Sequence, residues 1–89
     1  MAAWAVEFSA RAEADFARLD RTVRRRILLR IEWLSENFDT IVPLPLSGEF
    51  QDFYKLRVGN WRVVYTVAWN KNMITVHYID KRDKIYKRK

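Results

Sequence analysis

The sequence predicts an α+β fold, in which an antiparallel-rich four-stranded sheet carries an N-terminal helical hairpin on one face. Three observations predict it: a short alternating segment at the start, two helical periods after it, and three alternating segments in the second half. A chain of 89 residues has room for one core, so we expect a single domain over residues 1–89.

The start of the chain predicts a strand followed by a helix. Residues 4–8 alternate apolar and polar side chains, which is typical of a short, half-buried strand. Ser9 is a good N-cap, because its hydroxyl can accept a hydrogen bond from a backbone N–H of the first turn. A helix over residues 10–19 follows. We expect this helix to point Ala14, Phe16 and Leu19 inward and its charged residues, including Asp15, outward.

A second helix, capped by Asp20, has the clearest period in the chain, and the short junction before it predicts an antiparallel helical hairpin. Its apolar residues recur at spacings of three and four, which predicts one buried stripe. The consecutive arginines at 24–26 are interpreted as a solvated face, a docking face for an acidic partner, or a basic nucleic-acid-binding helix. The stripe consists of Val23, Ile27, Ile31, Leu34 and Phe38.

The second half of the chain predicts three strands. Residues 39–49 are expected to be a connector, since prolines within them cannot continue a helix. A strand over residues 53–58 is followed by a two-residue turn at 59–60, where Gly and Asn both tolerate a positive φ angle. After the next strand, a turn at residues 69–72 leads to a final strand over residues 73–80.

The positive charge is a property of the strand half alone. Residues 1–49 hold seven Lys/Arg and eight Asp/Glu, whereas residues 50–89 hold ten and three. Strand alternation places Lys55 and Arg57 on one face, and Arg62 on the matching face of the next strand. This distribution favours a polyanionic partner, above all nucleic acid, over a merely solubilising surface.

Several classes of site are excluded by composition. The chain has no cysteine and one histidine, and it lacks a glycine-rich phosphate loop, so we expect no metal and no cofactor. His77 is expected to be structural rather than catalytic. With neither a long apolar segment nor a signal peptide, we expect a cytoplasmic protein that does not contact membranes.

A metal-free cationic surface suits the cleavage of RNA. RNA carries its own nucleophile, the 2′-OH, beside the scissile phosphate. An enzyme then needs to deprotonate that hydroxyl, stabilise charge on the phosphoryl oxygens and assist the leaving oxygen. The alternative is that Lys55, Arg57 and Arg62 are ordinary solvated strand residues.

At these residues the sequence resembles the RelE/ParE toxin superfamily, and more closely its RelE-type mRNA interferases. The resemblance covers nearly the whole chain. It implies a RelE-like fold and the toxin of a type II toxin–antitoxin system, which cleaves mRNA in the decoding site of the ribosome and is neutralised by a cognate acidic antitoxin. It rests on Leu46-Ser47-Gly48, Tyr54-Lys55-Leu56-Arg57, Trp61-Arg62-Val63-Val64-Tyr65, and the Arg82–Tyr86 Arg-x-x-x-Tyr ending.

The resemblance also implies roles for single residues. The position of Lys55 binds phosphate, that of Arg62 stabilises the transition state, that of Arg82 assists the leaving group, and that of Tyr86 orients or stacks a nucleotide. The expected catalytic set is Lys55, Arg57, Arg62, Arg82 and Tyr86, with Lys81, Lys84 and Lys87 as further RNA-binding residues.

The chain departs from the family pattern at two positions. Arg57 stands where many relatives have a lysine that acts as the base, and Lys81 stands where many have a histidine. Because arginine stays protonated, we expect Lys55 to take over as base, the alternative being a site without a base. Two other functions stay open: a ParE-like toxin that binds and poisons DNA gyrase without cutting, and a general basic nucleic-acid binder.

Overall fold

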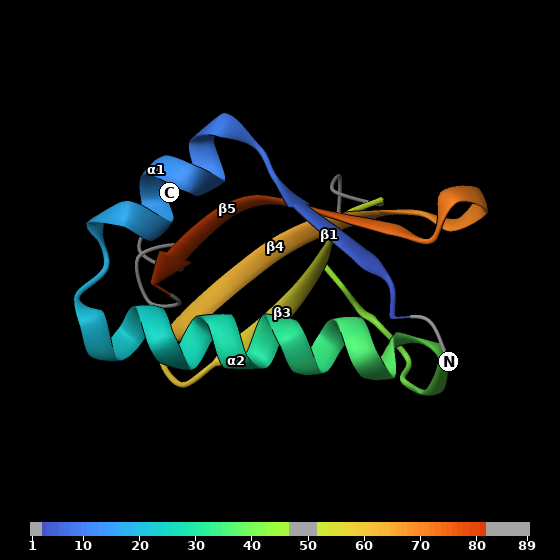
Figure 1. The fold of residues 1–89 in the computed structure, drawn as a ribbon, viewed down its shortest axis with the longest axis horizontal. Helices are drawn as coiled ribbons and strands as arrows, with labels where there is room; N and C mark the ends of the chain where they lie inside the picture. The colour runs from blue at the N-terminus through green and yellow to red at the C-terminus, as the bar shows by residue number, and fades with distance from the viewer. Residues whose placement is uncertain (1–2, 47–51, 82–89) are drawn as a thin grey trace.

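Two helices lie against a five-stranded mixed sheet (Figure 1). The computed structural model describes residues 3–46 and 52–81. None of the helices in these ranges is long and apolar enough to cross a membrane. In chain order the elements are β1 (Ala5–Phe8), α1 (Ala10–Arg18), α2 (Arg21–Asn37), η1 (Phe38–Thr40), β2 (Leu44–Pro45), β3 (Tyr54–Val58), β4 (Trp61–Ala68), η2 (Trp69–Lys71) and β5 (Met73–Lys81).

The strands follow the order β1-β5-β4-β3-β2, with β1 parallel to β5 and the other pairs antiparallel. The α+β class is confirmed, but the described residues contain five strands where four were expected. The additional strand, β2, lies within the predicted connector and pairs Leu44 with Lys55 and Pro45 with Tyr54. Proline lacks an N–H donor, and it is tolerated here because β2 is the outermost strand of the sheet.

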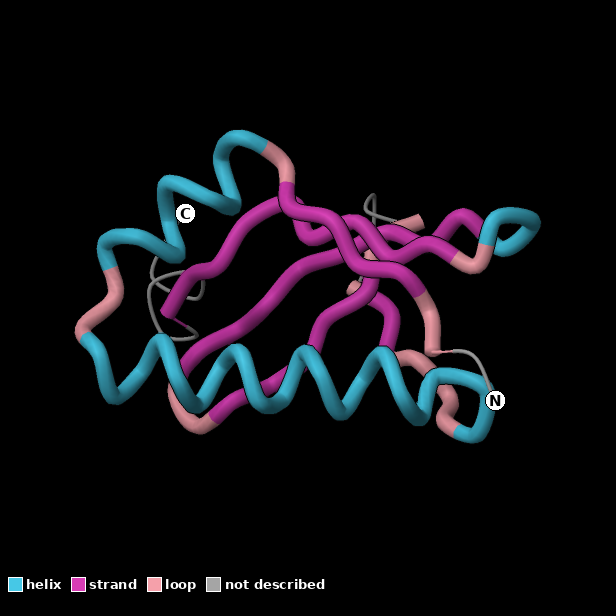
Figure 2. The backbone as a smooth tube through the Cα atoms, viewed as in Figure 1, coloured by secondary structure: helices cyan, strands magenta, loops and turns pink. Residues whose placement is uncertain are grey.

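The second helix and its stripe match the prediction. Asp20 caps α2 by accepting a hydrogen bond from the backbone N–H of Val23 at 2.9 Å. Ile27, Ile31 and Leu34 are buried, and they form one core with residues of β3, β4 and β5. A short loop joins α2 to α1, as Figure 2 shows. The helix therefore covers one face of the sheet, and this face holds the main core.

The first helix packs on β5 largely as predicted, since Leu19 is buried and Phe16 packs against the core, but one inward residue differs. Ser9 caps it as expected, accepting from the N–H of Ala12 at 3.1 Å. Ala12 is buried, whereas Ala14 is exposed, so the prediction for Ala14 was wrong. Asp15, expected to point outward, accepts a hydrogen bond from the N–H of Ile79 at 3.1 Å. Since β1 pairs only with the first half of β5, α1 takes over the edge of the second half.

The turn between β3 and β4 has the predicted length of two residues, since Val58 pairs with Trp61. Only Gly59 has a positive φ angle there, of 59°. The guanidinium of Arg26 on α2 lies over this turn, and a Cβ at Gly59 would come within 2.9 Å of its Nη2. The hairpin is therefore held close to α2.

Candidate functional site

The strand register arranges the predicted cations in rows on the face of the sheet turned away from α2. Arg57 on β3 lies opposite Arg62 on β4, and Arg62 lies opposite Asp80 on β5. In the next row Lys55 lies opposite Val64. The alternation read from the sequence thus brought the three strand cations together correctly.

A β-bulge in β5 decides which of its side chains join this face. Tyr65 pairs with Val76, but the neighbouring Val64 pairs with Tyr78, so His77 is an additional residue in β5. Alternation shifts by one position after the bulge. Asp80 consequently lies beside Arg62, while Lys81 lies opposite Trp61 on the other face.

Lys81 therefore does not share a face with the catalytic candidates. Its Nζ lies 5.6 Å from the centre of the Trp61 ring, in a cation–π contact. The remaining predicted residues lie outside the described ranges, as do Ser47 and Gly48 of the Leu-Ser-Gly motif. Those site residues are Arg82, Lys84, Tyr86 and Lys87.

The face is less open than the sequence suggested. Arg62 is only 3 % exposed, and Val64 is fully buried although it does not belong to the main core. Leu46, which follows β2, is buried in the same way outside that core. A second, smaller apolar layer thus surrounds part of the cationic face. A guanidinium in such surroundings interacts with phosphate more strongly than one in water, because the local dielectric constant is lower.

Sequence reasoning missed a contribution from α1. Arg11 reaches around the edge of β5, where its Nη2 lies 3.9 Å from an oxygen of Asp80. Its guanidinium carbon also lies 4.5 Å from the centre of the Tyr78 ring. No local pattern could have identified Arg11, Tyr78 or Asp80 as neighbours, because they meet only through the packing of α1 on β5 and the bulge.

His77 has partners of the kind expected for a structural residue. Its Nε2 lies 2.8 Å from the hydroxyl of Thr66, and its ring centre lies 5.3 Å from that of Phe53. These contacts fix the ring at the end of the cationic face.

A pocket of about 480 Å³ opens between α1 and the ends of β4 and β5. Its size is within the range of small-molecule sites, and it carries cations, carboxylates and an aromatic ring. Asp80 lines it and also lies beside Arg62, so the pocket adjoins the cationic face. The residues that matter for its charge and shape are Arg11, Asp15, Arg18, Trp61, Asp80 and Lys81.

The apolar core beneath the site shifts the pKa of one tyrosine. Burial, with a smaller contribution from Tyr54, raises the pKa of Tyr65 to about 12. The two rings are stacked with their centres 5.8 Å apart. The hydroxyl of Tyr65 thus stays protonated at physiological pH.

Comparison with known proteins connects this geometry to toxins. Residues 6–86 match the model of the family described as the ParE toxin of type II toxin–antitoxin systems, parDE. Among curated protein sequences, none matches the chain significantly.

Solved structures with a similar fold belong to the same group of proteins. The RelBE2 toxin–antitoxin complex of Mycobacterium tuberculosis gives a TM-score of 0.79 at 22% identity over 92% of this chain and 94% of that chain. The isolated E. coli RelE toxin gives 0.76 at 27% identity over 94% and 92%. The YoeB/ParE toxin from Agrobacterium tumefaciens gives 0.71 at 18% identity over 86% and 96%. The resemblance stated from the sequence motifs is confirmed.

Proposed function

The chain belongs to the ParE toxin family of type II toxin–antitoxin systems, within the RelE/ParE group, and from this premise we propose that it is a metal-independent endoribonuclease that cleaves mRNA on the ribosome. The observation that carries the proposal is the position of Arg62. It is buried on a sheet face, between Arg57 and Asp80 and beside the row of Lys55. Three cations around one desolvated position suit a phosphate whose negative charge grows during the reaction.

In the proposed reaction the RNA supplies the nucleophile. Lys55 accepts the proton of the 2′-OH, the 2′ oxygen bonds to phosphorus, and the P–O5′ bond breaks. The products are a 2′,3′-cyclic phosphate and a 5′-hydroxyl. Arg57 and Arg62 stabilise the charge on the phosphoryl oxygens. Arg82 protonates the leaving 5′ oxygen, or stabilises its charge while water supplies the proton, and Tyr86 stacks on or orients a nucleotide, as the family resemblance implies.

The lysines at the end of the chain would bind the flanking RNA. Lys81 lines the pocket beside Asp80 and contacts Trp61, so this pocket offers a charged and aromatic surface next to the cleavage site. Lys84 and Lys87 follow in the sequence. A nucleotide adjacent to the scissile phosphate can therefore be held in this pocket, which adjoins the cationic face at Asp80.

Two macromolecular partners follow from this proposal. The ribosome would hold the mRNA in the reactive geometry, and such positioning is worth several kcal/mol of the barrier. A cognate acidic antitoxin would cover the cationic face, as suits the net charge of the strand half. The similar M. tuberculosis protein was solved as a toxin–antitoxin complex.

The test is cleavage of a defined mRNA by the purified protein, with and without translating ribosomes, followed by mapping of 5′-hydroxyl ends. We expect rapid cutting of ribosome-bound mRNA and slow cutting of the same RNA alone. Efficient cutting of free RNA at many positions would refute the dependence on the ribosome.

The second candidate is inhibition of DNA gyrase without cleavage, as the resemblance to ParE-like toxins implies, and the matching family model is named after ParE. A gyrase supercoiling assay with the same preparation separates the two candidates. Inhibition of supercoiling with no new RNA ends would replace the ribonuclease proposal.

A further inference from the structure

The outward side of α2 carries a stripe whose charge reverses halfway along the helix. Two exposed arginines lie in its N-terminal half and two exposed glutamates in its C-terminal half. Between them Leu28 is 42 % exposed and Leu29 is 55 % exposed, which is unusual for adjacent leucines of a small domain. The stripe consists of Arg21, Arg25, Leu28, Leu29, Glu32 and Glu36.

The stripe is symmetric about the midpoint between Leu28 and Leu29. Arg25 and Glu32 are equally far from this midpoint, and the same holds for Arg21 and Glu36. A second copy of the helix, laid antiparallel across the first, would therefore place each arginine against a glutamate and each leucine against a leucine. An isologous two-fold contact requires this kind of self-complementary surface.

We propose that α2 is the interface of an antiparallel homodimer, with the two leucines of each copy at its centre. The charged residues of the stripe are available for such a contact. Within the described residues the ion pairs join Arg11, Arg18, Asp15 and Asp80, and no residue of the stripe takes part. Among residues 3–46 and 52–81, the arginines and glutamates of the stripe thus have no competing salt bridge.

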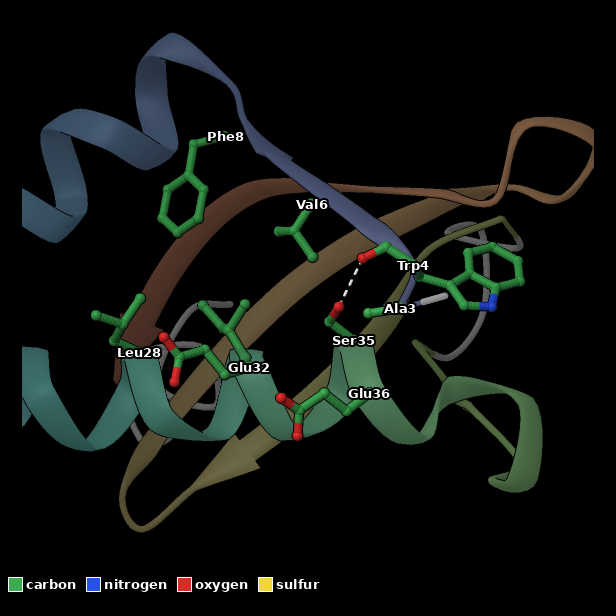
Figure 3. Close-up of a pocket in the computed structure, with 9 residues that line it drawn as sticks. Ala3, Trp4, Val6, Phe8, Leu28, Glu32, Ser35 and Glu36 are labelled. Carbon is green, nitrogen blue, oxygen red and sulfur yellow. Dashed lines mark hydrogen bonds between the residues drawn. The ribbon is translucent and has the colours of Figure 1, made fainter. Parts of the chain in front are cut away.

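The surroundings of Leu28 provide room for the side chains of a second helix. Figure 3 shows a groove between β1 and α2, with Val6 and Phe8 across from Leu28 and Glu32. This groove has a volume of about 490 Å³. A second groove of about 640 Å³, lined by Phe16 and the arginines in the first half of α2, also includes Leu28. The two grooves meet at the proposed centre, where ridges of a partner helix can pack.

The reversal of charge along the stripe favours a second copy of this chain over other binding partners. An acidic peptide or an RNA would be attracted by Arg21 and Arg25 but repelled by Glu32 and Glu36 at the other end. A parallel pair of helices would bring like charges together along the whole stripe. Only the antiparallel arrangement of two identical stripes satisfies both halves.

The proposed dimer leaves the cationic face accessible in both copies. The stripe lies outside the buried residues of α2 and borders the edge strand β1, while Lys55, Arg57 and Arg62 lie on the far side of the sheet. Dimerisation through α2 is thus independent of the proposed function, and its failure would not affect the cleavage proposal.

Sedimentation equilibrium of the purified chain over a wide concentration range tests the proposal. We expect the mass to rise with concentration from that of the 10.8 kDa monomer to that of a dimer. Arg25→Glu and Glu32→Arg should each weaken the dimer about tenfold or more, because the two-fold axis repeats each like-charge contact. The double variant with both changes restores opposite charges and should recover the dimer. Lys71→Glu, an exposed change of the same size on η2, is the matched control.

Crosslinking gives a second measurement, since the chain contains no cysteine. Under mild oxidation Leu29→Cys should form a covalent dimer, because residues near a two-fold axis meet their own counterparts, whereas Lys71→Cys should not. Circular dichroism checks that each variant is folded. A mass that stays monomeric at every concentration, a dimer insensitive to Arg25→Glu, or a double variant that fails to recover would each overturn the proposal.

Discussion

Replacing Arg62 by methionine separates its proposed chemistry from its place in the fold. Arg62 is 3 % exposed, and its strand partners are Arg57 and Asp80. Removing one charge of a buried pair is costly when its partner is left uncompensated, whereas an apolar side chain of similar volume is often neutral when no buried charge is left unpaired. Asp80 still has Arg11 at 3.9 Å, so its carboxylate keeps a cation nearby. We therefore expect the free energy of unfolding of Arg62→Met to stay within about 1 kcal/mol of the parent.

The cleavage rate should respond very differently. Loss of one donor that stabilises transition-state charge costs about 10²–10³ in rate, or roughly 3–4 kcal/mol of the barrier. The assay is single-turnover cleavage of ribosome-bound mRNA, run beside urea unfolding of the same preparation. Arg62→Lys keeps the charge but loses the planar fork of the guanidinium. Its cleavage rate should therefore lie between those of the parent and of Arg62→Met. A folded Arg62→Met protein that cleaves as fast as the parent would refute the role of Arg62. An inactive Arg62→Lys protein in the same experiment would not change this conclusion.

Three further predictions concern the base, the core and the hairpin. Lys55→Met should lower the cleavage rate by about 10²–10⁴ and abolish the rise of this rate with pH, whereas Arg57→Lys should keep activity. An unchanged pH profile in Lys55→Met would exclude Lys55 as the base. Burial raises the pKa of Tyr65 to about 12, so the unfolded chain loses this proton first, and the free energy of unfolding should fall by about 2 kcal/mol between pH 10 and 12. Urea unfolding across this range should show a smaller decline in Tyr65→Phe, and an equal decline would contradict the assignment. Gly59→Ala should lower the free energy of unfolding by about 1–2 kcal/mol, because φ at Gly59 is 59° and the new Cβ would displace the guanidinium of Arg26. A variant as stable as the parent would contradict this explanation.

The helices were predictable because their signals are local. The cap residues Ser9 and Asp20 bond to N–H groups three residues away, and the stripe of α2 depends only on helical spacing. The orientation of α1 was predictable only in part, since Phe16 and Leu19 were placed correctly but Ala14 was not. Its period fits more than one inward face, and the choice of Ala12 over Ala14 is made by contact with β5, from which Asp15 accepts the N–H of Ile79.

The strand β2 was missed for a related reason. Leu44 and Pro45 have no alternating pattern of their own, and a proline argues against a strand in the interior of a sheet. They form a strand because β3 offers a free edge, with Lys55 and Tyr54 as partners. Such a two-residue strand is determined by its neighbour, so its own sequence does not indicate it.

The candidate site was predicted up to the point where the bulge intervenes. Period-two alternation placed Lys55, Arg57 and Arg62 correctly, because β3 and the start of β4 pair without interruption. Continued through β5 from the buried Val76, the same alternation would put Lys81 beside the catalytic cations and Asp80 in the core. The additional residue at position 77 reverses both positions.

This reversal changes the chemistry of the face. A lysine next to Arg62 would add a further like charge to a desolvated row, which is costly when no phosphate is bound. The carboxylate of Asp80 instead offsets part of that charge and links the row to Arg11 on α1. The position of α1 along β5 is fixed in turn by Asp15 and the N–H of Ile79. The bulge therefore balances the charge of the cationic face when it is empty and ties the face to the helix that packs on its edge.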